Sequence, residues 1–380
     1  MRKNLNISLA LTALFALGTV QANDTLKFKG QLSAYTLVNS SQEKSWAAGG
    51  RFIPQLNYEI NTRKQKLIDF EASANLYGHT AFHNFDSGSY SGRLKPYRLW
   101  GRYSTPQFEL RAGLQKINFG SASLLRPLMW FDQMDPRDPL QLTDGVWAVL
   151  ARYYFMNNAN LWLWGLYGNE QRKGWEVFAT RKQTPEFGGR LQIPVPRGES
   201  GFTYHHRTAN GSGITDSLNP NVHFKENRFG FDAKFDMLVG WWIEASWSNY
   251  NESIGTYRNQ EIINLGVDYT FGLGNGLNLI YEHLLAASDE KAFAFSSVLN
   301  FSLLNVSYPL GLFDRLGAIV YYDWTNQKAY SFLNWQRQFN KLTLHVMGYI
   351  NPKTYELPAQ DMDQNLYAGT GGQLMLVYNF

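Results

Sequence analysis

The residues best suited to chemistry in this chain are charged side chains on the polar side of segments in which apolar and polar residues alternate. The basic members are Arg98, Arg102, Arg111, Arg152 and Arg190, and the acidic members are Glu59, Asp69, Glu71 and Glu109. Guanidinium groups bind carboxylates and phosphates through paired hydrogen bonds. We predict a basic wall that favours anionic or zwitterionic solutes. The alternative is a structural arginine ladder that the four acidic residues neutralise.

The segment from residue 117 to residue 145 shows no such alternation. Pro127, Pro136 and Pro139 prevent it from pairing as a strand, because proline has no amide hydrogen to donate. Its central stretch, MWFDQMDPRDP, begins with apolar residues that are unsuited to a loop in water. The segment is therefore expected to pack against the rest of the protein.

This segment also carries an aspartate at every third position, namely Asp132, Asp135 and Asp138. We predict a constriction loop that folds into a lumen and sets these aspartates opposite the arginines, so that a transverse field selects solutes. The residues assigned to the loop are Arg126, Trp130, Asp132, Asp135, Arg137 and Asp138. In the alternative interpretation, the Asp-Pro steps only turn the chain, and the aspartates are solvated or paired with Arg126 and Arg137. A divalent-cation site is a weaker alternative, because the spacing differs from that of a calcium loop. No metal or cofactor is expected.

The elements that must position these residues are β-strands, because alternation with a period of two dominates the chain after Asn23. Eighteen candidate strands, or 16–18 if weak segments are discounted, lie near residues 26–35, 51–60, 68–76, 95–104, 107–116, 146–155, 160–168, 186–195, 200–207, 227–236, 238–249, 261–271, 277–285, 293–303, 317–324, 331–338, 341–350 and 371–380.

The links between these strands alternate in length. Even-numbered links are mostly short, whereas odd-numbered links such as residues 79–94, 117–145 and 169–185 are longer. One even-numbered link, residues 304–316, is longer than this rule predicts. Short turns at one end and long loops at the other are typical of transmembrane β-barrels.

The polarity of the two strand faces separates a membrane barrel from a soluble one. The polar face repeatedly carries arginine and glutamate, whereas the apolar face is rich in aromatic residues, which make up 16% of the chain and cluster at strand ends. Such clusters form the aromatic girdles of membrane barrels. A mean hydropathy of −0.34 excludes a bundle of membrane helices. We therefore predict an all-β protein, a transmembrane antiparallel up-and-down barrel with an inward-folded third external loop.

The N-terminus predicts export. Arg2 and Lys3 precede an apolar run, and Val20-Gln21-Ala22 suits a cleavage site, so residues 1–22 are expected to be a signal peptide and residues 23–380 a single barrel domain. The formal charge of +4 falls to +2 without Arg2 and Lys3, which argues against nucleic acid as a partner. Strand-like sequence begins directly after Asn23, so no N-terminal plug is expected.

Two motifs carry a resemblance to known families. The C-terminal GGQLMLVYNF, with Tyr378 and the final Phe380, resembles the last strand of Gram-negative outer-membrane barrels, which the insertion machinery reads. The stretch LRAGLQKINFG, with Arg111, Gly113, Gln115 and Gly120, is similar to a strand of the 18-stranded substrate-specific porins and alginate-export channels.

This resemblance implies a porin in the outer membrane that allows passive diffusion of small hydrophilic solutes. Its expected partners are outer-membrane lipid, lipopolysaccharide, the insertion machinery and the solutes themselves. A monomer and a homotrimer are both compatible with it. An alginate-type channel would pass an acidic polysaccharide along an arginine track.

Two other classes of function stay open. One is an outer-membrane hydrolase, for which His205, His206, His283 and His345 are the available bases, although no serine stands at a fixed short spacing from them. The other is a structural or complex-forming barrel whose lumen is closed by loops.

Overall fold

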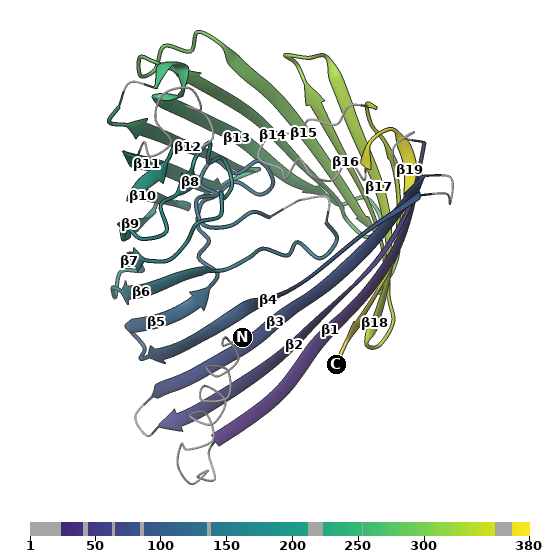
Figure 1. Cartoon of the computed structure of the whole chain (residues 1–380), viewed down its shortest axis with the longest axis horizontal. Coiled ribbons are helices and arrows are strands. Elements are labelled where there is room, and N and C mark those ends of the chain that lie inside the picture. The colour runs from purple at the N-terminus through teal and green to yellow at the C-terminus, as the bar shows by residue number, and fades with distance from the viewer. Residues whose placement is uncertain are drawn as a thin grey trace, which may run out of the picture.

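The computed structural model describes residues 24–40, 45–62, 65–83, 87–134, 138–211, 223–252, 254–353 and 367–380. Figure 1 shows a ring of strands, labelled in chain order. Their bounds are β1 Asp24–Asn39, β2 Trp46–Thr62, β3 Lys66–His83, β4 Ser87–Ser104, β5 Phe108–Gln115, β6 Val146–Tyr154, β7 Asn160–Leu166, β8 Ala179–Thr180, β9 Glu186–Val195, β10 Gly198–Asn210, β11 His223–Asp236, β12 Gly240–Tyr250, β13 Asn259–Phe271, β14 Leu277–Asp289, β15 Val298–Pro309, β16 Asp314–Asp323, β17 Lys328–Gln338, β18 Leu342–Ile350 and β19 Thr370–Asn379.

Neighbouring strands pair antiparallel around the ring, and β1 pairs with β19 to close it. The two-residue β8 pairs only with the end of β10, and β7 pairs directly with β9. The wall is therefore a closed barrel of 18 strands, which confirms the predicted fold class. Within the described residues, no helix is long and apolar enough to cross a membrane. The predicted signal peptide, residues 1–22, lies outside the described residues.

Strand β6 illustrates why the sequence forms this wall. Trp147, Val149 and Tyr153 are exposed on the outward face, while Ala148 and Leu150 are buried on the inward face. A closed sheet pairs every backbone amide and carbonyl between strands, which hydrocarbon surroundings require. The apolar outward face then meets lipid without further cost.

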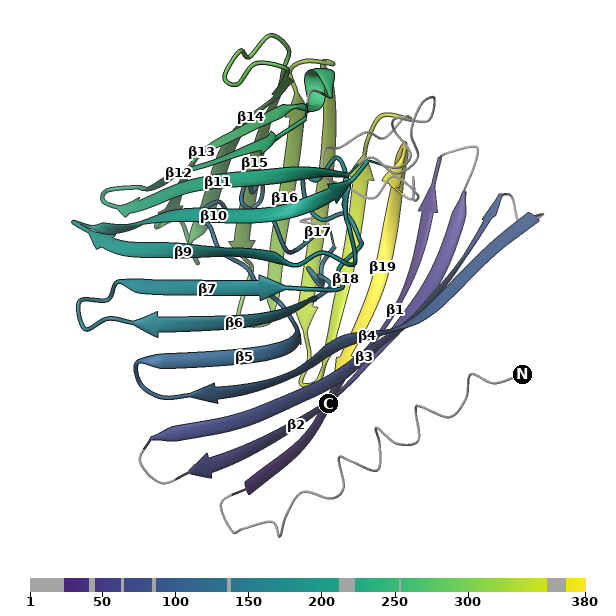
Figure 2. The ribbon, with the colours of Figure 1, turned by 60° about the vertical axis from the view of Figure 1, so that its left-hand side comes forward.

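Two predicted links differ in the structure. The link at residues 79–94 was expected to be a long loop, but β3 continues to His83 and β4 begins at Ser87, so that β1–β4 project beyond the other strands (Figure 2). The sequence there is polar and rich in glycine and serine, yet strand pairing needs only backbone groups. The link at residues 304–316 contracts to a short turn, because β15 extends to Pro309 and β16 begins at Asp314.

The C-terminal residue lies at the seam where the barrel closes. Phe380 and Gly30 exchange two backbone hydrogen bonds of 3.0 Å. The Phe380 ring lies 5.6 Å from the Phe28 ring, 6.3 Å from Phe52 and 6.0 Å from Tyr378. A Cβ atom at Gly30 would come within 2.3 Å of the Phe380 ring, so a larger residue there would displace the ring from this position.

We predict that Phe380→Ala destabilises the closed barrel. The change removes three ring contacts, each worth about 0.5–1 kcal/mol, and the loss should appear as unfolding at a lower urea concentration in detergent. Phe313→Ala, at an exposed turn position, is the matched control. Equal unfolding midpoints for the two variants would contradict a role of Phe380 in closure.

Candidate functional site

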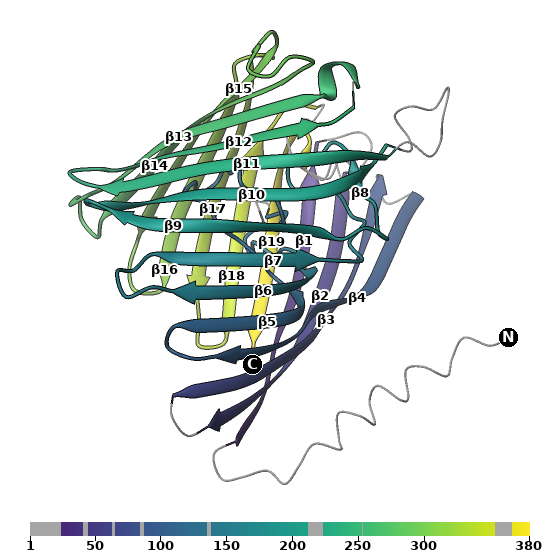
Figure 3. The same ribbon diagram turned by 90° about the vertical axis from the view of Figure 1, so that its left-hand side faces the viewer.

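The segment between β5 and β6 runs along the inward face of the wall as far as β14 and then returns. In the first half of the segment, the Ser121 hydroxyl donates to Asp232 on β11 at 2.9 Å, and the Ala122 amide donates to Glu244 on β12 at 2.8 Å. The following amides reach Glu282 on β14. We call residues 116–134 and 138–145 the long inner loop; Figure 3 shows the strands to which it is bound.

Two fully buried carboxylates hold the turn of this loop. Glu282 accepts the amide hydrogens of Ser123, Leu124 and Leu125, at 2.7 Å for Ser123 and 3.1 Å for Leu124. Glu244 accepts those of Ala122 and Leu128, at 2.8 Å and 2.7 Å. Hydrogen bonds to a charged acceptor contribute about 1.5–3 kcal/mol each. Since a loop lacks its own ladder of hydrogen bonds, these carboxylates supply the acceptors that its backbone needs.

Apolar packing explains the hydrophobic centre of the loop. Leu128, Trp130 and Phe131 are buried in a cluster with Trp164 of β7 and Leu150 of β6. The Trp130 indole also donates to Ser246 on β12 at 3.0 Å. The expectation that this stretch packs against the protein is therefore correct.

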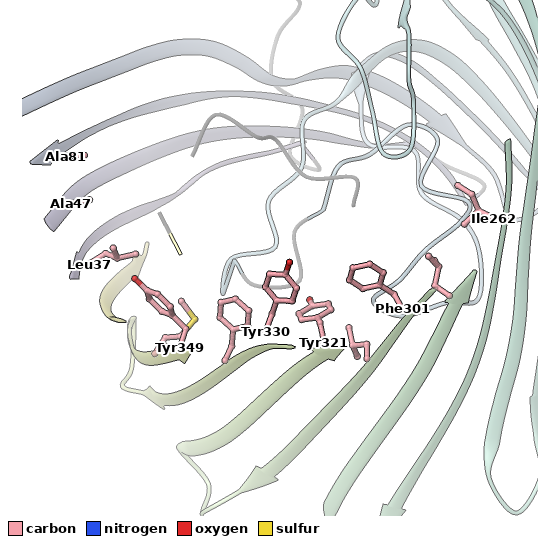
Figure 4. Packing of buried hydrophobic residues seen from close by; sticks show 12 residues of the cluster. Leu37, Ala47, Ala81, Ile262, Phe301, Tyr321, Tyr330 and Tyr349 are labelled. Atoms are coloured by element: carbon pink, nitrogen blue, oxygen red, sulfur yellow. The ribbon is translucent and has the colours of Figure 1, made fainter. Parts of the chain in front are cut away.

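A second apolar cluster lines the inner wall on the opposite side. Figure 4 shows Phe301, Tyr321, Tyr330 and Tyr349 side by side with Leu37, on strands from β15 round to β1. Leu124 and Leu125 of the long inner loop pack against this cluster, as does Trp175 from the next loop. The tip of the long inner loop thus contacts both apolar and carboxylate groups of the far wall.

Residues 167–178, which follow β7, form a second inner loop. The Trp175 indole donates to the Arg126 carbonyl at 2.9 Å, which joins the two loops. Glu176 forms ion pairs with Arg207 at 3.1 Å and with Arg228 at 2.9 Å, and both arginines also pair with Glu226. Two guanidinium and two carboxylate groups therefore neutralise one another in a fully buried cluster. Burial lowers the pKa of the nearby Lys173 ammonium, and the Glu176 and Glu186 carboxylates oppose that shift.

The basic wall lies on β4–β6, away from these anchors. Glu109 lies between three guanidinium groups, 3.3 Å from Arg102, 3.1 Å from Arg111 and 3.6 Å from Arg152. Arg102 forms a second, two-pronged pair with Asp69, both bonds being 2.8 Å. Three positive groups face two negative ones, so the cluster retains one positive charge.

Aromatic rings pack against the arginine guanidinium groups of this wall. The Arg111 guanidinium lies 4.8 Å from the centre of the Trp100 ring, and that of Arg152 lies 3.8 Å from the centre of the Trp162 ring. Arg98 lies 3.9 Å from the Tyr97 ring centre and donates to the Thr143 carbonyl at 2.9 Å. Cation–π contacts hold guanidinium groups without neutralising them.

The remaining predicted acidic residues share the inward face of β2 and β3. Glu59 lies directly opposite Asp69, and Glu71 lies opposite Trp100 in the strand register. Both are partly exposed. Through Asp69 and Trp100, both glutamates neighbour the cluster of Arg102, Arg111 and Arg152 on the inward face.

Two predicted roles are wrong. Asp132 does not face the arginine wall, because it is buried and pairs with Arg126 of its own loop at 2.7 Å. Arg190 is not an open part of that wall, because it is buried and bound to Asp232 through both of its terminal nitrogens. Both results follow from the cost of leaving a buried charge unpaired.

The other loop aspartates give less information. Asp138 accepts the Leu140 amide at 3.0 Å within a turn. Asp135 and Arg137 lie outside the described residues. Among the described residues, no three His, Cys, Asp or Glu side chains gather in a way that could hold a metal ion.

Sequence reasoning missed the anchors of the inner loops. Glu244 and Glu282 each stand alone on the polar face of an aromatic or apolar strand, in WWIEASW and LIYEHLL. That position identifies them as inward residues. Nothing in either strand indicates that a loop more than 100 residues earlier supplies the hydrogen-bond donors.

The histidines do not assemble a hydrolase triad in the described part of the chain. His205 is buried between the Trp164 indole, which donates to Nδ1 at 3.2 Å, and Glu186, 3.3 Å from Nε2. His283 contacts the Ser302 hydroxyl at 2.9 Å on the outward face, but that hydroxyl also accepts the Trp324 indole at 2.8 Å. Within the described residues no carboxylate or amide side chain hydrogen-bonds to this pair, whereas a triad requires a third group to orient the base.

We predict that Glu282→Gln loosens the long inner loop. The new amide group places its own donors against the loop amides, at a cost of about 1–3 kcal/mol. Chymotrypsin should then cleave after Trp130 or Phe131, both of which are buried in the native protein. Glu199→Gln, at an exposed position beside a turn, is the matched control. Equal protease resistance of both variants would show that Glu282 does not anchor the loop.

Comparison with known proteins agrees with this architecture. No protein-family model matches the chain, and no curated protein matches it in sequence. Among solved structures, Pseudomonas aeruginosa OccK5 (OpdH) is similar with a TM-score of 0.57 at 11% identity, over 93% of this chain and 98% of that one. Acinetobacter baumannii OccAB4 gives a TM-score of 0.55 at 10% identity, over 95% and 98%. The shared fold is the outer-membrane β-barrel, as predicted.

Proposed function

We propose that this barrel is a diffusion channel for small hydrophilic solutes and that it prefers anions. The observation that carries the proposal is a division of charge between two parts of the inward face. The carboxylates of β11, β12 and β14 are engaged by the inner loops or by buried arginines. On β4, Lys95 pairs with Asp144 and the buried Arg98 donates to the Thr143 carbonyl of the long inner loop. Arg102, Arg111 and Arg152, by contrast, form no hydrogen bond or ion pair with the inner loops among the described residues, and they stay partly exposed.

The inward positions of β1–β6 are mainly basic. Alternation from the Arg102–Asp69 pair assigns this face to the basic residues Lys27, Lys29, Arg51, Arg93, Lys95, Arg98, Arg102, Arg111 and Arg152 and to the acidic residues Glu59, Asp69, Glu71 and Glu109. Arg51 and Lys95, which extend the predicted set, both lie over the Tyr77 ring, at 5.5 Å and 5.4 Å from its centre. An excess of fixed positive charge along one side of a narrow path raises the local concentration of anions.

Exposure separates the arginines into two groups. The side chains of Arg102, Arg111 and Arg152 are 25%, 16% and 17% exposed. Those of Arg126 and Arg190 are only 4% and 3% exposed, and each is bound to an aspartate. Only the first group offers hydrogen-bond donors to a passing solute, and we assign the selective wall to it.

The long inner loop supports the same proposal as the element that narrows the path. Its turn is fixed to β12 and β14, while its ends lie at β5 and β6. A solute that passes this loop is left with the face that carries the arginines. In this arrangement the loop directs solutes to the wall by occupying the opposite side, and Asp132 adds no net charge to the field because Arg126 neutralises it.

A structural barrel with a closed lumen is the second candidate. It is favoured by one observation, namely that the two inner loops are joined to each other and to buried clusters on both sides. Single-channel recording in a planar bilayer separates the two candidates. Discrete ion-conducting steps support the channel, and a bilayer that stays silent after confirmed insertion rejects it.

We predict that the double variant Arg111→Gln and Arg152→Gln shifts selectivity toward cations. The arginine cluster then changes from one excess positive charge to one excess negative charge, while Arg102 still pairs with Asp69 and Glu109. The anion-to-cation permeability ratio, taken from the reversal potential in a salt gradient, should fall on the order of twofold or more.

Arg337→Gln is the control for this experiment, because Arg337 is exposed and pairs with Asp314 away from the arginine wall. It should leave the reversal potential unchanged. An unchanged reversal potential in the double variant would refute the arginine wall, even if the conductance proves that the lumen is open.

A further inference from the structure

The outward face of β7 and β9–β13 contains a hollow of about 1000 Å³. Figure 3 faces these strands from outside. The hollow arises where small residues, Gly189 and Ala245, alternate with large ones such as Phe202, Phe231 and Ile263 on the same face. Because its lining is almost wholly apolar and lies on the lipid side of the barrel, it suits a hydrocarbon chain.

An aromatic group and a carboxylate border this hollow at the long-loop end. The Trp247 ring lies 5.3 Å from Phe229 and 5.2 Å from Phe293. Phe293 belongs to the link between β14 and β15, and its amide donates to Glu261 at 2.9 Å. Glu261 is the third residue of β13 and lines the hollow.

The Glu261 carboxylate is buried but incompletely hydrogen-bonded. The residue is only 2% exposed, and within the described residues its Oε2 atom has no hydrogen-bond partner. Almost all buried polar atoms in folded proteins are hydrogen-bonded, because an unpaired one costs the full desolvation energy. Glu261 lies on the outward face beside the apolar hollow, so a molecule that occupies the hollow can supply a donor to this oxygen.

We propose that this hollow binds an acyl chain of an outer-leaflet glycolipid and that Glu261 accepts a hydrogen bond from the amide N–H at the head of that chain. A carboxylate repels phosphate, so the site recognises a neutral donor next to the chain. Amide-linked chains carry such a donor, whereas ester-linked chains of glycerophospholipids do not. The long-loop end is the external end of the barrel, which places Glu261 at the level of the outer leaflet.

The test is native mass spectrometry of the full chain in detergent. Purified lipid A, which carries amide-linked chains, and phosphatidylglycerol, which carries only ester-linked chains, are added at equal concentration. The wild-type protein should retain lipid A about tenfold better, as one additional charge-assisted hydrogen bond predicts. Equal retention of the two lipids overturns the proposal without recourse to any variant.

Variants then locate the site. Ala245→Phe fills the hollow and should abolish the preference for lipid A, whereas Ala318→Phe, on the outward face of β16, should leave it intact. Glu261→Gln should reduce the preference while leaving the hollow open. Identical behaviour of the two alanine variants, or a dimer mass that only Ala245→Phe removes, would overturn the proposal, the latter in favour of a second copy of the chain.

Discussion

The interior of this barrel depends on hydrogen bonds between buried carboxylates and the backbone of a loop. Glu244 and Glu282 together accept amide hydrogens from Ala122 through Leu125 and from Leu128. A loop that leaves the wall loses the ladder that satisfies strand backbone, and apolar side chains cannot replace it. Carboxylates are efficient replacements because one group accepts several short, charge-assisted bonds. The position of the loop is therefore set by where the wall carries acidic residues.

This use of carboxylates also determines the charge that the lumen retains. Asp232 is bound to Arg190, and Glu226 is shared between Arg207 and Arg228, so these groups contribute little field beyond their own clusters. On β4–β6 the balance of charge differs, because Glu109 alone pairs with three arginines. Tryptophan rings pack against two of these guanidinium groups and leave their positive charge in place. Arginine and acidic residues thus form neutral anchors on one side of the lumen and a positive surface on the other. The two sides differ in the ratio of basic to acidic residues and in how far these residues are exposed.

The sequence predicted the wall much better than the interior. A period of two residues fixes which side chains share a face, so Arg102, Arg111 and Arg152 could be placed together before their contacts were known. The failure of that period at residues 117–145 also identified the long inner loop. Which segments meet across the lumen depends on how the barrel closes. The loop between β5 and β6 joins two neighbouring strands, but in the closed barrel it reaches β12 and β14. The Arg126–Asp132 pair shows the opposite limit, because two charges six residues apart in one loop neutralise each other locally before a distant wall can compete.

Glu244 and Glu261 show how one pattern serves two environments. They lie on adjacent strands and on opposite faces, Glu244 toward the lumen and Glu261 toward the lipid. Inside, both oxygens of the carboxylate meet amide donors from the chain itself. Outside, the chain supplies one donor, from Phe293, and the second oxygen of Glu261 has none among the described residues. The loops of the barrel thus complete the hydrogen bonding of the carboxylate in the lumen, but supply only one donor to the carboxylate on the lipid side. The second donor that we assign to a membrane lipid would complete Glu261 as the loop amides complete Glu244.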